Sequence, residues 1–131
     1  MTEKPLALVV DDDEHLGKLL GMALELAGFE AEVIHDGQIV IERMTERIPI
    51  LVSLDMQMPH VSGAEVLREI RADARFTDVK VMIVTANGRA AEETDVREMA
   101  DVILIKPVTF TQIREFASRL THTKKEDDPT S

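Results

Sequence analysis

Short apolar runs alternate with amphipathic stretches along most of the chain. Five runs are rich in leucine and β-branched residues, as buried strands are: residues 6–10, 31–35, 50–54, 79–84 and 102–105. Four of these runs are almost continuously apolar, which is typical of strands covered on both faces. The run 31–35 instead alternates polar and apolar residues, which predicts a strand at the edge of the sheet.

Between the runs, apolar residues recur every three or four positions, the spacing of one face of a helix. The predicted helices bury stripes composed of Leu16, Leu19, Leu20, Ala23, Leu24 and Ala27, of Ile41, Met44 and Ile48, of Ala64, Leu67, Ile70 and Ala74, and of Phe110, Ile113, Ala117 and Leu120. Gly28 is expected just beyond the first helix, while Asp13 and Thr109 are expected to cap the first and the last. A helix between Gly88 and Ala100 has few large apolar side chains, so we expect it to pack shallowly and shift easily.

Strands that alternate with helices pair in parallel through right-handed crossovers, with helices on both faces of the sheet. The pattern therefore predicts an α/β fold, a (βα)₅ sandwich of three layers. We expect one domain over residues 1–121 and a disordered polar tail over residues 122–131, because the tail has no large apolar residue to hold it. Nothing resembling an output domain or a linker remains, so the domain is expected to stand alone.

The balance of charges narrows the classes of function. The chain has 15 Lys and Arg residues against 25 Asp and Glu residues, a net charge of −10, so nucleic acids and anionic lipid surfaces would repel it. It has no cysteine, which excludes disulfides, thiolate metal sites and a cysteine nucleophile. No apolar run approaches the roughly 18 residues of a membrane helix. We expect a cytoplasmic protein that binds neither membranes nor, directly, nucleic acid.

Polar side chains follow four of the predicted strands. Asp11 and Asp12 follow the first strand and Asp55 the third, while Thr85 ends the fourth and Lys106 follows the fifth. We expect them to meet, because the carboxyl ends of parallel strands share one edge of the sheet. Crowded carboxylates need a positive partner, and a site made of oxygen ligands fits Mg²⁺. Lys106 and Thr85 could then bind phosphoryl oxygens, and an aspartate can form an acyl phosphate.

Several short motifs occur at these strand ends: Val9-Val10-Asp11-Asp12-Asp13, Leu54-Asp55-Met56-Gln57-Met58-Pro59 with Gly63, Val84-Thr85-Ala86, Ala100-Asp101 and Ile105-Lys106-Pro107. Each motif alone is weak, but their order and placement are specific. Together, over residues 6–120, they resemble the receiver domain of two-component response regulators. The resemblance implies a flavodoxin-like fold with the strand order 2-1-3-4-5 and a cis bond before Pro107.

The resemblance also implies a role for each site residue. Asp55 would be the phospho-acceptor, and Thr85 and Lys106 would bind the phosphoryl oxygens. The ligands of Mg²⁺ would be Asp12 and Asp55 directly, Asp11 through water, and the backbone carbonyl of Gln57. As such a phospho-acceptor, the chain is not expected to be an enzyme beyond catalysing its own phosphorylation and dephosphorylation.

The implied partners are proteins. A sensor histidine kinase or a phosphotransfer protein would donate the phosphoryl group from a phosphohistidine. A downstream protein would bind the face formed by the fourth predicted helix, the fifth strand and the fifth helix, because phosphorylation pulls the loop after the fourth strand. We expect a monomer or a weak, phosphorylation-linked dimer.

One position departs from the family pattern. Ile103, three residues before Lys106, stands where most receivers have Tyr or Phe. Isoleucine cannot make the same large rotation, so we expect the output face to respond to phosphorylation differently. Gln57 and Asn87 occupy positions that tune the lifetime of the phosphoryl group in this family. The histidines lack the spacing of metal ligands and are expected to be solvated: His15, His35, His60 and His122.

Two other functions stay open. A degenerate receiver would act as an interaction module without phosphorylation, which Ile103 makes conceivable. A Mg²⁺-dependent phosphatase would use an aspartyl-phosphate intermediate, as haloacid-dehalogenase-like enzymes do. Those enzymes have a second aspartate two residues after the nucleophile, where this chain has Gln57, and the chain has no cap domain.

Overall fold

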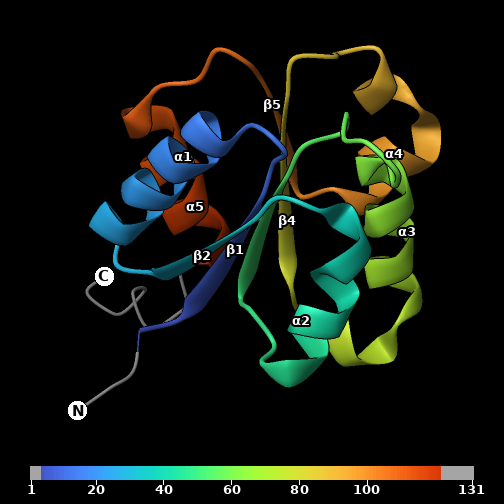
Figure 1. The fold of residues 1–131 in the computed structure, drawn as a ribbon, viewed down its shortest axis with the longest axis horizontal. Coiled ribbons are helices and arrows are strands. Elements are labelled where there is room, and N and C mark those ends of the chain that lie inside the picture. The colour runs from blue at the N-terminus through green and yellow to red at the C-terminus, as the bar shows by residue number, and fades with distance from the viewer. Residues whose placement is uncertain (1–3, 122–131) are drawn as a thin grey trace.

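Five parallel strands form the centre of the molecule in a computed structural model that describes residues 4–121. The predicted tail, residues 122–131, lies outside the described residues. The strands are β1 (Leu6–Val10), β2 (Glu30–Ile34), β3 (Leu51–Leu54), β4 (Lys80–Thr85) and β5 (Val102–Ile105). They pair in the order β2-β1-β3-β4-β5, with β2 and β5 at the edges (Figure 1). The predicted strand order and the edge position of β2 are confirmed.

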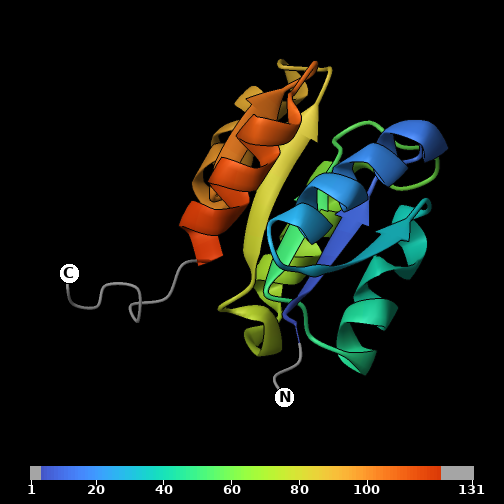
Figure 2. The same cartoon turned by 90° about the vertical axis from the view of Figure 1, so that its left-hand side faces the viewer.

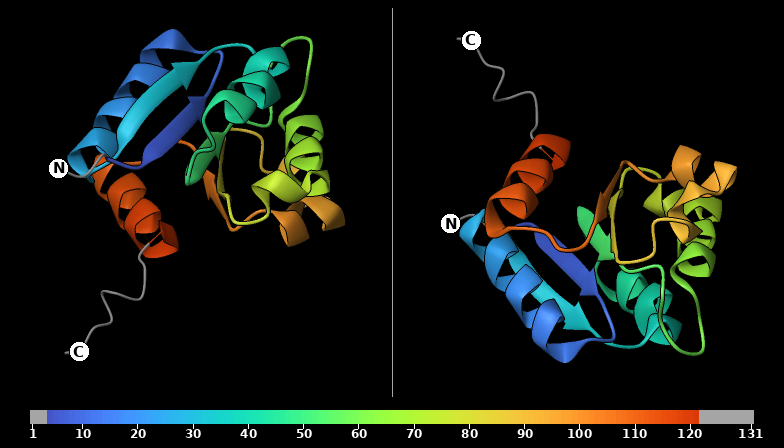
Figure 3. Two further views of the ribbon diagram at one scale, coloured as in Figure 1. Left: turned by 90° about the horizontal axis from the view of Figure 1, so that it is seen from below. Right: turned by 90° about the horizontal axis from the view of Figure 1, so that it is seen from above.

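Helices cover both faces of this sheet. They are α1 (Glu14–Leu26), α2 (Val40–Glu46), α3 (Gly63–Ala72), α4 (Thr94–Met99) and α5 (Phe110–Thr121), with short 3₁₀ turns η1 (Gly37–Ile39), η2 (Ala74–Phe76) and η3 (Ala90–Glu92). Helices α1 and α5 lie on one face, nearest the viewer in Figure 2, and α2, α3 and α4 lie on the other. Views from below and from above show helices on both sides of the sheet (Figure 3). The predicted (βα)₅ sandwich is therefore confirmed.

Each face of the sheet has its own apolar core. The core under α1 and α5 contains Leu24, Met82 and Ile113, and the core under α2, α3 and α4 contains Leu54 and Phe76. Because parallel strands are buried on both faces, successive residues of one strand contribute to opposite cores. This double burial fixes the strand ends, and with them the loops that carry the polar residues.

The predicted helix ends are confirmed where a cap was recognised. Asp13 accepts a hydrogen bond from the Leu16 N–H at 3.0 Å at the start of α1, and Gly28 lies beyond its end with a φ of 103°. The Thr109 hydroxyl accepts one from the Gln112 N–H at 3.0 Å before α5. Both caps satisfy N–H groups that have no partner within the helix.

Three residues of the predicted buried stripes are exposed: Ile48, Ala74 and Phe110, the last at the start of α5 with 38% of its surface exposed. Helix α2 ends at Glu46, and Ile48 beyond it is 52% exposed. Pro49 disfavours helical backbone at the residue before it, so the predicted stripe could not reach Ile48. Ala74 is exposed in η2, because α3 ends at Ala72.

The segment between Gly88 and Ala100 contains the 3₁₀ turn η3 and then α4, which has six residues. Within α4 only Val96 is buried, so the predicted shallow packing is confirmed. Among the helices of residues 4–121, neither α4 nor any other has the length and apolar character to cross a membrane.

Candidate metal and phosphoryl site

Main-chain hydrogen bonds extend the sheet beyond the strands and place the polar residues. The Asp11 N–H donates to the Ile34 carbonyl at 3.0 Å, and the Asp55 N–H donates to the Val10 carbonyl at 3.0 Å. The Lys106 N–H donates to the Thr85 carbonyl at 2.9 Å. The residues that follow β1, β3 and β5 are thus held in register at one edge of the sheet, as the sequence predicts.

Three carboxylates meet at this edge. Asp11, Asp12 and Asp55 each place a carboxylate oxygen so that all three atoms lie within 4.8 Å of one another. Asp11 and Asp55 are buried, whereas Asp12 is exposed. A cluster that offers only oxygen ligands fits a hard divalent cation such as Mg²⁺, which keeps several waters and needs few protein ligands. The residues present therefore fit the predicted metal.

Lys106 joins two of these carboxylates. Its Nζ lies 3.1 Å from Asp11 Oδ2 and 3.0 Å from Asp55 Oδ2. The Lys106-Pro107 peptide bond is cis, as the motifs imply. When all three acids are ionised, the ammonium group leaves two negative charges in the cluster, the number that a divalent cation neutralises.

The environment shifts the protonation of two groups. Burial raises the pKa of Asp11, and the hydrogen bonds from the Asp13 N–H and from Lys106 reverse only part of that increase. Burial alone would lower the pKa of Lys106, but the hydrogen bonds to Asp11 and Asp55 outweigh it, so the pKa of Lys106 is raised. Lys106 therefore stays positively charged beside Asp55 at neutral pH.

Thr85 and Gln57 lie at the same edge with other contacts. The Thr85 side chain is buried, and its hydroxyl accepts a hydrogen bond from the Asn87 N–H at 3.1 Å. Asn87 in turn accepts from the backbone N–H groups of the next turn, at 3.1 and 3.2 Å. The Gln57 N–H donates to Asp55 Oδ1 at 3.2 Å, and its side chain is exposed. The phosphoryl contact of Thr85 and the metal contact of the Gln57 carbonyl stay predictions.

Gly63, at the start of α3, packs against the backbone that carries Asp55. A Cβ at this position would lie 2.1 Å from the Asp55 carbonyl oxygen, so no other residue fits without a shift of the main chain. The Gly63 N–H donates to the Met56 carbonyl at 3.0 Å. This contact joins the Asp55 loop to α3.

Three long-range polar contacts, made by His35 and Asp101, were not predicted. The exposed His35 directs Nδ1 to the Asp11 carbonyl at 2.9 Å, so it is solvated as expected but also bonded to the site. Asp101, part of one motif, lies at the other edge of the sheet, where it accepts from the Val81 N–H at 2.7 Å and from Arg71 at 2.9 Å. All three contacts join residues at least 20 positions apart, and no local spacing in the sequence indicates them. His122, the last of the four histidines, lies outside the described residues.

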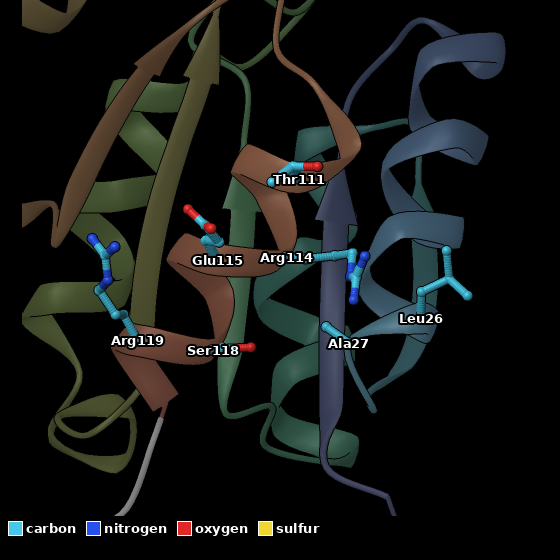
Figure 4. Close-up of a pocket in the computed structure, with 7 residues that line it drawn as sticks. All are labelled: Leu26, Ala27, Thr111, Arg114, Glu115, Ser118 and Arg119. Carbon is cyan, nitrogen blue, oxygen red and sulfur yellow. The ribbon is translucent and has the colours of Figure 1, made fainter.

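A surface hollow of about 710 Å³ lies elsewhere, between the C-terminal end of α1 and α5. Its lining comprises Leu26, Ala27, Thr111, Arg114, Glu115, Ser118 and Arg119 (Figure 4). None of the clustered acids lines it. The chemistry described above therefore belongs to the strand ends and not to this hollow.

Known proteins are similar to this chain in sequence and in fold. A model of the response regulator receiver domain matches residues 7–118. The chain belongs to this family. It is 40% identical over 101 residues to the CpxR homolog of Haemophilus influenzae, a transcriptional regulatory protein, covering 76% of this chain and 43% of that protein. It is 34% identical over 110 residues to the phosphate regulon transcriptional regulatory protein PhoB of Rhizobium meliloti, covering 83% of this chain and 48% of that protein.

The receiver thus spans less than half the length of both relatives. Among solved structures, the response regulator TrrA of Thermotoga maritima was determined in complex with Mg²⁺-BeF. It superposes with a TM-score of 0.79 at 29% identity, covering 88% of this chain and 98% of that one. The flavodoxin-like fold and the receiver resemblance predicted from the motifs are confirmed.

Proposed function

We propose that this receiver accepts a phosphoryl group on Asp55 from a phosphohistidine of a sensor histidine kinase or phosphotransfer protein, with Mg²⁺ bound beside it. One observation carries the proposal. Lys106 Nζ lies 3.0 Å from Asp55 Oδ2, while Asp11 and Asp12 place carboxylate oxygens within 4.8 Å of the same aspartate. A nucleophilic carboxylate, a fixed cation and a pair of acids able to hold a metal are the parts that phosphoryl transfer needs.

The reaction exchanges one bond to phosphorus for another. An Asp55 carboxylate oxygen attacks the phosphorus atom as the bond from phosphorus to the donor imidazole nitrogen breaks. That nitrogen keeps the electron pair of the broken bond and takes up a proton from solvent. Mg²⁺ held by Asp11, Asp12 and Asp55 would neutralise part of the charge that develops during transfer. Lys106 supplies a second positive charge from a fixed position, so little reorganisation is needed during transfer.

The modified state gives Thr85 a new partner. A phosphoryl group on Asp55 adds strong acceptor oxygens next to β4. The Thr85 hydroxyl, which now accepts from Asn87, would turn to donate to one of them. Because Asn87 holds the turn that leads to η3, this exchange pulls on the segment that carries α4.

We propose the face of α4, β5 and α5 as the surface that a downstream protein binds. Ile105 of β5 is 49% exposed and Phe110 of α5 is 38% exposed, so apolar side chains are available there. Ile103, at the position of the family's aromatic residue, is half-buried and packs against the core under α4. Its signal would therefore be a change in packing and not a change in exposure of an aromatic ring.

The net charge of −10 supports one further part of the proposal, that the receiver acts through protein contacts and makes no direct contact with nucleic acid. We also propose that it works as a monomer or a weak phosphorylation-linked dimer, and that it catalyses only its own phosphorylation and dephosphorylation.

The test is phosphorylation by a small acyl phosphate in the presence of Mg²⁺, followed by intact mass spectrometry. We expect one added phosphoryl group on the parent chain and none on Asp55→Asn. Asp78→Asn, which removes an exposed carboxylate outside the cluster, is the matched control and should be labelled like the parent. Because the chain has no Trp, folding of each variant is checked by NMR.

Three results would contradict the proposal. Label retained by folded Asp55→Asn would move the acceptor to another residue. A folded parent that takes up no label would favour the interaction module that works without phosphorylation. Repeated turnover of a generic phosphate ester would favour the phosphatase.

A further inference from the structure

The end of β2 holds both main-chain polar groups of Asp11. The Asp11 N–H donates to the Ile34 carbonyl at 3.0 Å, and the next residue, His35, directs Nδ1 to the Asp11 carbonyl at 2.9 Å. A carbonyl oxygen only accepts hydrogen bonds, so Nδ1 carries the proton and donates. The last residue of β2 and the residue after it therefore fix the backbone on both sides of one acid of the cluster.

The carbonyl that His35 holds belongs to the peptide unit between Asp11 and Asp12. A peptide unit is planar, so fixing its oxygen also fixes the direction of the Asp12 N–H. The direction of the Asp12 carboxylate then depends only on the backbone and side-chain torsions of Asp12 itself. Asp12 is the exposed member of the cluster, whereas the Asp11 side chain is already held by the Asp13 N–H at 3.0 Å and by Lys106 at 3.1 Å.

Gly17 of α1 allows β2 to lie close to this helix, because the tight contact of a Cβ there would be with Val33. A Cβ on Gly17 would lie 2.9 Å from Val33 Cγ1 and 3.6 Å from His35 Cε1. A larger residue would push β2 away from the first turns of α1. On its open side the His35 ring lines a hollow of about 370 Å³ together with Glu14, His15, Lys18 and Val33. Because this side is solvent, His35 can be replaced without opening a cavity in the core.

We propose that His35 is a positioning residue for the Mg²⁺ site, which keeps the Asp12 carboxylate beside Asp11 and Asp55 through its hydrogen bond to the Asp11 carbonyl. The proposal rests on the metal binding that is part of the proposed function. Without the hydrogen bond, the loop samples more conformations in the free protein, and ordering it weakens metal binding. His35 itself touches neither the metal nor the phosphoryl group.

The test uses side chains that place a donor at different distances from the backbone. In His35→Asn the amide nitrogen occupies the position of Nδ1, whereas in His35→Gln it lies one bond farther out. We expect His35→Ala and His35→Gln to bind Mg²⁺ about threefold to tenfold more weakly than the parent, and His35→Asn to restore most of the affinity. His15→Ala, which removes the other imidazole of the same hollow, should leave the affinity unchanged.

Mg²⁺ affinity is measured by calorimetry and by NMR titration of the loop amides, and urea unfolding of each variant checks that it folds. If the folded parent binds no Mg²⁺, the proposed function itself is wrong. If the parent binds Mg²⁺ and folded His35→Ala binds it equally well, only the role of His35 is overturned. The same holds if His35→Asn is as weak as His35→Ala, because a donor at the Nδ1 position would then make no difference.

Discussion

Helices α1 and α4 are attached to the same sheet in different ways. Helix α1 has 13 residues, begins at the Asp13 cap and buries five residues along its inner face. Helix α4 has six residues and buries only Val96, and no side chain of the described residues caps its first turn. The two helices also begin at different loops: α1 follows the acids after β1, and α4 follows the loop after Thr85.

Polar contacts complete the attachment of α4. Arg68 of α3 reaches across to its first turn, with Nε 2.7 Å from Asp95 Oδ2 and Nη2 2.9 Å from Glu93 Oε1. These groups are exposed, and exposed ion pairs contribute little to stability. The loop with Asp11 and Asp12 therefore leads into a helix held by its core. The proposed output helix is held by Val96, by the surface ion pairs of Arg68, and by the hydrogen bond from Arg71 Nε to the Met99 carbonyl at 2.9 Å. In the proposed function, a phosphoryl group would shift such a helix without unfolding the site.

The largest effect is expected where α1 enters the core. Leu24→Ala removes a fully buried side chain, and we expect the free energy of unfolding to fall by about 3 kcal/mol in urea denaturation. Leu26→Ala, on the same helix but 65% exposed, is the control and should change it by about 0.5 kcal/mol or less. Equal losses in the two variants would contradict the view that one buried face holds α1.

A smaller and more local effect is expected in α4. Val96→Ala removes two methyl groups from the buried residue of this helix, which corresponds to about 1.5 kcal/mol. We expect faster amide hydrogen exchange in α4 and unchanged exchange in α1, because α4 can open without the rest of the sheet. Glu98→Ala, an exposed residue of α4, should leave both helices unchanged. Faster exchange throughout the molecule in Val96→Ala would show that α4 opens only with global unfolding.

The sequence predicts the residues at the strand ends correctly, but it predicts the ends of two helices wrongly. Asp11, Asp55 and Lys106 were predicted to meet because each follows a buried strand and parallel strands share an edge, and the structure brings them together. Ile48 and Ala74 were misplaced because apolar spacing continued past the helix ends. Pro49 ends α2 before Ile48. The Asp73 carboxylate accepts a hydrogen bond from the Arg75 N–H at 3.0 Å and starts a new turn after α3.

Contacts between distant segments could not be predicted in this way. Arg68 and Asp95 are 27 positions apart, and His35 and Asp11 are 24 apart. Each pair depends on how two elements lie across the fold, and neither partner has a spacing that distinguishes it from an ordinary surface residue. The side chains that carry the proposed chemistry were predictable, whereas those that position them were not.

The smallest effect is expected at the ion pair itself. The hydrogen bonds from Arg68 lower the pKa of Asp95. The pKa of Asp95 in the folded state thus lies below its unfolded value, so the pair stabilises the protein at neutral pH and its contribution is lost as the pH falls through the folded pKa. In Arg68→Gln we expect the pKa of Asp95 to rise toward its ordinary value, as measured by NMR titration of the side-chain carboxyl group.

Arg75→Gln is the matched control, because Arg75 pairs with Asp73 on the turn after α3 and its loss should raise the pKa of Asp73 instead. Arg68→Gln should also shift the amide resonances of α4 while those of α1 stay in place, and added salt should reduce the difference between variant and parent. If Asp95 titrates unchanged and the α4 amides do not move, the Arg68 ion pairs do not hold α4, and Val96 together with the hydrogen bond from Arg71 to the Met99 carbonyl does. Helices α1 and α4 would then differ mainly in the number of residues that they bury, because the surface ion pairs would contribute nothing to holding α4.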